Sequence, residues 1–197
     1  MNTSPIYERV YDWLYHGISL RGCGLVLGVV MILLHVWALL KATSAADWLR
    51  RAPRDKPLGI ALLTVDLLWA MLIVSAMDMG EFWRLRRYAL VLIPAAYGLM
   101  IVYVEEFLAA RALGMLLLLL AGPVLDAAFL ELPGTRLLLP ILAYVWIGFG
   151  LFWVGMPYLM RDHLGWATAT QGRFKSLAAA GAGYGLLVLV CAFAFWK

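Results

Sequence analysis

Among the ionisable side chains within or at the edge of the long apolar stretches of this 197-residue sequence, five are candidates for a shared site: His35, Asp66, Glu105, Glu106 and Arg111. A charged group at the centre of a membrane-spanning helix costs about 3 kcal/mol, so residues of this kind are functional candidates. An imidazole beside a carboxylate can carry a proton or hold a ligand, because histidine titrates near neutral pH. The same side chains can instead join neighbouring helices through hydrogen bonds, and the sequence leaves both roles open.

The composition indicates an integral membrane protein. Hydrophobic residues make up 64% of the chain and charged residues 14%, with a mean hydropathy of +0.87. Soluble domains contain about 45–50% apolar and about 25% charged residues. The net charge of +4 suits an anionic membrane surface, but the chain lacks the basic groove that nucleic-acid binding needs. We therefore expect a lipid bilayer as partner, no nucleic acid, and the plasma or inner membrane of a bacterium as location.

The apolar pattern predicts an all-α polytopic transmembrane helix bundle with about six spans, forming a single domain over residues 1–197. The predicted spans cover about 22–40, 58–77, 88–103, 107–129, 137–160 and 177–196. Residues 1–21 precede them and predict an amphipathic helix lying in the membrane interface. The stretch 88–129 decides the count, because its 42 residues exceed the roughly 20 that one span needs. We predict that it doubles back at Glu105 and Glu106.

Six spans place both termini on one side and allow depths to be compared along neighbouring spans. His35 lies about 8 Å and Asp66 about 12 Å from the side that carries residues 41–57. Arg111 lies about one turn into its span, and the two glutamates lie at the turn before it. We therefore predict one polar pocket that opens on this side, lined by all five residues, with His35 and Asp66 in contact.

Two further groups of residues predict contacts with lipids and between helices. Basic residues of the long connections predict binding to anionic lipid headgroups; they are Arg50, Arg51, Arg54, Lys56, Arg161, Arg173 and Lys175. Gly24 with Gly28, and Gly181 with Gly185, are pairs of glycines four residues apart. This spacing predicts faces on which another helix packs closely.

The sequence contains no HExxH, GxSxG or Walker motif and no cluster with metal-ligand spacing. We therefore name no catalytic residue and expect no metal and no cofactor. The predicted function is an accessory, assembly or scaffold subunit of a larger membrane complex, with other membrane subunits or a second copy as partners. One alternative is a small transporter or a proton or ion pathway through the one-sided polar pocket. A second alternative is a membrane-embedded enzyme that modifies lipids.

Overall fold

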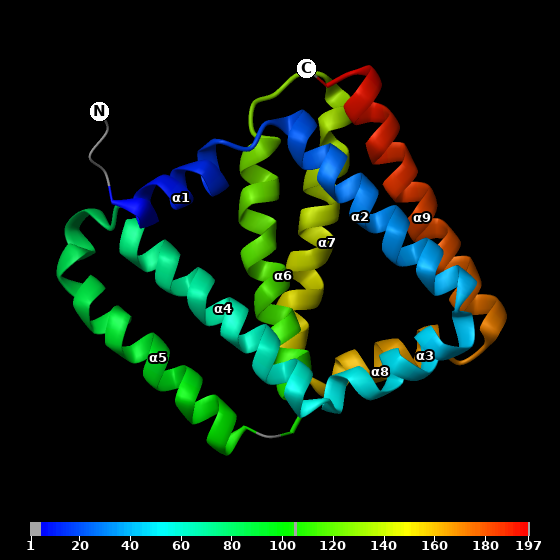
Figure 1. The fold of residues 1–197 in the computed structure, drawn as a ribbon, viewed down its shortest axis with the longest axis horizontal. Helices are drawn as coiled ribbons and strands as arrows, with labels where there is room; N and C mark the ends of the chain where they lie inside the picture. The colour runs from blue at the N-terminus through cyan, green and yellow to red at the C-terminus, as the bar shows by residue number, and fades with distance from the viewer. Residues whose placement is uncertain (1–4, 105, 197) are drawn as a thin grey trace.

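The computed structural model describes residues 5–104 and 106–196. Over these residues the chain is 87% helical, contains no strand and forms nine α-helices, six of which are long and apolar enough to cross a membrane. The spans are α2 (Leu20–Leu40), α4 (Lys56–Ala76), α5 (Arg86–Tyr103), α6 (Leu108–Ala127), α7 (Leu138–Gly155) and α9 (Gln171–Ala194) (Figure 1). The predicted helical bundle with six spans is therefore confirmed.

The stretch 88–129 doubles back, as predicted. Helix α5 ends at Tyr103, and α6 begins at Leu108 and runs in the opposite direction (Figure 1). Phe107, just before α6, has a φ of 56°, and this left-handed conformation reverses the chain within a few residues. The two helices do not pack mainly on each other, because α4 packs against both of them.

The ends of the last two spans differ from the prediction. Helix α7 ends at Gly155, five residues before the predicted end, and Pro157 begins a separate helix, α8 (Tyr158–Ala167). Proline has no N–H to continue the helix before it but is well suited to the start of the next one. Helix α9 begins at Gln171, six residues early, because the Thr170 side chain accepts a hydrogen bond from the Arg173 N–H at 3.3 Å.

Short helices lie across the two ends of the bundle. At one end α1 (Ile6–His16) packs against α4 and α6, where the Trp69 indole donates a hydrogen bond to the Tyr15 hydroxyl at 3.1 Å. Burial raises the pKa of Tyr15 above its ordinary value, so the hydroxyl stays neutral in this contact. At the other end α3 (Ala42–Arg51) and α8 lie side by side (Figure 1). The Arg50 guanidinium joins them by donating to the Thr168 hydroxyl at 2.9 Å and to the Thr168 carbonyl.

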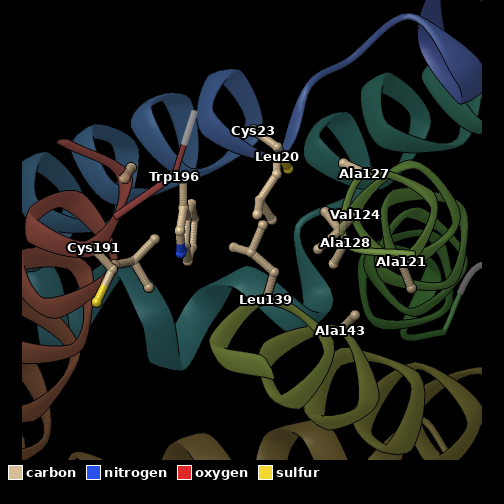
Figure 2. Close-up of a cluster of buried hydrophobic side chains, with 12 residues drawn as sticks. Leu20, Cys23, Ala121, Val124, Ala127, Ala128, Leu139, Ala143, Cys191 and Trp196 are labelled. Carbon is tan, nitrogen blue, oxygen red and sulfur yellow. The ribbon is translucent and has the colours of Figure 1, made fainter. Parts of the chain in front are cut away.

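The largest apolar core joins α2 and α9 to α6 and α7 near the end of the bundle that carries α1. Figure 2 shows Trp196 between α2 and α9, with Leu20 and Leu139 reaching toward each other beside it. Trp196 is only 2% exposed, and its indole N–H donates to the Thr135 hydroxyl at 2.9 Å. The C-terminal residue of the described chain therefore connects α9 to the segment that precedes α7.

Helices α2 and α9 approach each other through glycines. A Cβ added at Gly28 would lie 3.0 Å from the Gly185 carbonyl oxygen, and one at Gly185 would lie 2.9 Å from the Met31 Cβ. Added Cβ atoms at Gly24 and Gly181 would overlap the rings of Trp196 and His35. The structure thus places all four predicted packing glycines between α2 and α9, where larger residues would force the helices apart.

Candidate functional site

Four of the five residues predicted to share one polar pocket are described by the structure, and these four lie in three separate places. The His35 imidazole donates from Nδ1 to the Met31 carbonyl at 2.7 Å. Its ring packs directly against Gly181 of α9, where a side chain would overlap it. Asp66 faces α5 and α6 instead. The predicted contact between His35 and Asp66 is therefore wrong, because α2 packs mainly against α9 and not against the helix that follows it in sequence.

Glu106 and Arg111 lie together at the turn between α5 and α6. The Arg111 guanidinium donates to the Glu106 backbone carbonyl at 3.0 Å, while the Glu106 side chain is exposed. Glu105, the other predicted member at this turn, lies outside the described residues. Arg111 and Glu106 line a surface hollow at this end of the bundle, well separated along the helices from Asp66.

The seven basic residues predicted to meet lipid headgroups all lie at the end of the bundle that carries α3 and α8; they are Arg50, Arg51, Arg54, Lys56, Arg161, Arg173 and Lys175. Several of them also make protein contacts. The guanidinium carbons of Arg54 and Arg161 lie 5.5 and 5.9 Å from the centre of the Phe107 ring. Arg173 lies 4.7 Å from the ring centre of Trp166 and donates to its carbonyl at 2.9 Å. Their contact with lipid stays a prediction.

Among the predicted residues that the structure describes, Asp66 is the one that combines depth, burial and free hydrogen-bonding capacity. It is the eleventh of the 21 residues of α4, so it lies at the middle of a helix about 32 Å long. The residue is 4% exposed, and neither carboxylate oxygen has a hydrogen-bond partner among the described residues. A buried polar group without a partner costs about 1–3 kcal/mol, so this one calls for an explanation.

Asp66 is one of the residues that line a partly open cavity of about 320 Å³ between α4, α5 and α6, and its two carboxyl oxygens are covered by neighbouring protein atoms. We call this space the Asp66 cavity. Apart from Asp66 and Tyr97 its lining is apolar, and includes Leu63, Ile93, Ala96, Met100, Met115 and Leu118. Small-molecule sites in proteins have about this size and combine apolar walls with a few polar groups.

Tyr97 of α5 is the residue of this site that the sequence reasoning missed. The Thr64 hydroxyl donates its hydrogen to the Ile60 carbonyl at 2.7 Å, so the 2.9 Å contact between Thr64 and Tyr97 is a hydrogen bond that Tyr97 donates. A signal was present in the sequence. Thr64 lies eight residues after the start of α4 and Tyr97 six residues before the end of α5, which places both polar groups at similar depth on antiparallel helices.

The arrangement favours binding over covalent chemistry. Among the described residues that line the Asp66 cavity there is no serine, cysteine or histidine to act as a nucleophile or as a second acid–base group. The described part of the chain also contains no group of three or more His, Cys, Asp or Glu side chains placed to hold a metal ion. The Asp66 cavity is therefore an apolar space with one acidic residue, Asp66, in its lining.

The fold defines the protein as a membrane-embedded helical protein, with six apolar helices of spanning length within residues 5–104 and 106–196. No protein-family model, curated protein or solved structure matches the chain.

Proposed function

We propose that the protein binds a small, mainly apolar molecule within the membrane, in the Asp66 cavity. The observation that carries this proposal is Asp66, a residue that is 4% exposed, lines a cavity of about 320 Å³ and has no hydrogen-bond partner for its carboxyl oxygens among the described residues. A bound molecule would supply the missing hydrogen bonds and fill the apolar space. Ionisable residues within a membrane span often mark substrate pathways or act as counter-ions of ligands, which supports a functional role for Asp66.

The lining of the cavity supports binding of an apolar molecule over passage of an ion. An ion pathway needs polar groups or water along the whole thickness of the membrane. The described walls provide only Asp66 and Tyr97, and the side chains on either side of them are aliphatic or methionine. A transporter that carries an apolar molecule fits this lining, whereas the predicted proton or ion pathway finds little support in it.

Helix α5 gives the ligand a route from the lipid. None of its described residues is buried, and it packs against α4 more extensively than against α6. The Asp66 cavity is partly open, so a molecule dissolved in the bilayer can enter beside α5 without crossing a polar surface. A small movement of α5 would widen the entrance at the cost of few contacts.

The test is chemical analysis of what the protein retains after gentle extraction. The protein is purified in lipid nanodiscs, extracted with organic solvent and analysed by mass spectrometry. We expect a molecule that is enriched with the wild type and depleted with Ala70→Phe, which places a ring in the cavity. Ala61→Phe adds the same ring to an exposed position of α4 outside the cavity and serves as the matched control. Equal recovery from both variants would refute binding in this cavity.

An accessory or assembly subunit of a larger membrane complex is the second candidate, and the exposure of α5 favours it. Leu92 of α5 is 64% exposed, so this helix offers a continuous apolar face to a neighbouring membrane subunit. In a gentle-detergent pull-down we expect a stoichiometric partner that is lost with Leu92→Trp. Leu33→Trp on α2, at a site that is also 64% exposed, is the control. Isolation of a monomer with no stoichiometric partner would refute this role.

A further inference from the structure

We infer that the molecule bound in the Asp66 cavity carries a positively charged group that donates hydrogen bonds, such as a primary amine, on a compact apolar body. This inference rests on the proposed function and specifies the class of its ligand. It follows from counting the hydrogen-bond donors and acceptors that the described walls present.

The two polar residues that line the cavity, Asp66 and Tyr97, retain acceptor capacity. The Tyr97 hydroxyl uses its hydrogen in the bond to Thr64, since the Thr64 hydrogen is donated to the Ile60 carbonyl. The oxygen of Tyr97 therefore retains only acceptor capacity. Both oxygens of Asp66 are without partners among the described residues, and an ionised carboxyl accepts at both. An ammonium group has three N–H donors and can therefore serve both acceptor oxygens of an ionised Asp66.

The described chain places no positive charge beside Asp66. Lys56 is the first residue of α4, and Arg86 and Arg87 are the first two of α5, so all three lie at helix ends. Arg111 is the fourth residue of α6 and donates to the backbone of the turn before that helix. A carboxylate at the middle of a span needs a compensating charge or must be neutral. A cationic ligand supplies this charge within the cavity itself.

The walls also limit the apolar part of the ligand. The cavity volume of about 320 Å³ limits the apolar part to the size of a small molecule. Met100 and Met115 contribute to its lining, and methionine side chains adapt to irregular shapes. We therefore choose a rigid hydrocarbon cage as the probe, which is available with a charged or a neutral head.

The experiment compares 1-aminoadamantane with 1-adamantanol, which differ only in the ammonium and hydroxyl heads. Equilibrium binding of each radiolabelled compound is measured to the full-length protein in phosphatidylcholine nanodiscs, and partition into empty nanodiscs is subtracted. Charge-assisted hydrogen bonds are about twice as strong as neutral ones. We expect the amine to bind at least about tenfold more tightly than the alcohol, which corresponds to about 1.4 kcal/mol.

Asp66→Asn removes the charge and keeps the size of the side chain. We expect it to reduce the affinity for the amine by at least about tenfold and to leave the affinity for the alcohol nearly unchanged. Asp126→Asn removes a carboxyl near the end of α6, outside the Asp66 cavity, and should change neither the affinity for the amine nor that for the alcohol. Asp66→Glu retains the charge and should retain the preference for the amine. If Asp66→Asn fails to fold, the affinities of the wild type for the amine and the alcohol still show whether the site prefers a cationic ligand.

The outcomes separate this inference from the function on which it rests. Equal affinities of the amine and the alcohol for the wild type, both lost in Ala70→Phe, would overturn the cationic ligand and leave binding in the cavity intact. A preference for the amine that survives in Asp66→Asn would also overturn the inference. Absence of saturable binding for both probes, with no molecule recovered by solvent extraction, would overturn the proposed function as well.

Discussion

Replacement of Asp66 by leucine is expected to stabilise the protein. If this carboxyl binds a ligand, then in the ligand-free protein it is a buried polar group that makes no stabilising contact with the rest of the chain. Sites that bind ligands often reduce stability in this way, and substitutions there exchange function for stability. If the carboxyl instead held two helices together, its removal would destabilise the fold.

The magnitude follows from what the substitution removes and what it adds. Neither oxygen of Asp66 has a partner among the described residues, so no hydrogen bond within them is lost. The cost of leaving a buried polar group unsatisfied, about 1–3 kcal/mol, disappears. Leucine is larger than aspartate, but Asp66 lines a cavity of about 320 Å³, which leaves space into which the surrounding side chains can move. We therefore expect the free energy of unfolding to rise by about 1–3 kcal/mol.

The assay is equilibrium unfolding in mixed micelles with increasing SDS, followed by tryptophan fluorescence on protein stripped of bound small molecules. Asp126→Leu is the control, because its carboxyl is 40% exposed and lies 3.7 Å from His16, and exposed ion pairs contribute less than about 1 kcal/mol. A loss of more than about 1 kcal/mol in Asp66→Leu would refute the reasoning. It would mean that the carboxyl has a structural partner.

Three further predictions concern the contacts that hold the helices in place. Gly185→Ala should reduce the free energy of unfolding by about 1–3 kcal/mol, because the added Cβ would lie 2.9 Å from a side chain of α2; Gly183→Ala, with open space around it, should change it by less than about 0.5 kcal/mol. Arg50→Gln should speed proteolysis between α8 and α9, since it weakens the link to Thr168. Tyr97→Phe should cost about 0.5–1.5 kcal/mol and speed hydrogen exchange in α5 with little change in α7.

Each of these three predictions has a clear contrary result. Equal stability of the two glycine variants would show that α2 and α9 are not in close contact. Unchanged proteolysis in the Arg50 variant would mean that α3 and α8 are held together by other contacts. Faster exchange spread evenly over α5 and α7 would indicate a general loss of stability and not release of α5 alone.

The sequence was sufficient to predict the number of spans because hydropathy and length act locally. The 42-residue stretch 88–129 exceeds one bilayer thickness, and its charged centre indicated where it turns. The same signal failed at the end of α7. Hydrophobic residues continue beyond Pro157, so the apolar pattern runs on although the helix stops there. Hydropathy indicates which residues lie in an apolar environment, but it does not show where a helix ends within that environment.

The arrangement of the candidate site was not predictable in the same way. Position along a span can be counted, but the direction in which a side chain points depends on which helices become neighbours. His35 and Asp66 have similar depths, yet α2 packs against α9 and α4 packs against α5 and α6. The two glycine pairs contained part of the answer, since Gly28 and Gly185 face each other across one interface. Pairing the two glycine motifs would have predicted that α2 packs against α9, and so that His35 lies at a different interface from Asp66.

The measurement that tests the central claim most directly is a cryo-electron microscopy map of the protein in a lipid nanodisc, at a resolution that shows side chains and bound molecules. We predict density for a compact molecule between α4, α5 and α6, within hydrogen-bonding distance of the Asp66 carboxyl. A carboxyl bonded to another side chain of this protein, with α5 closed against α6 and no space between them, would contradict the account.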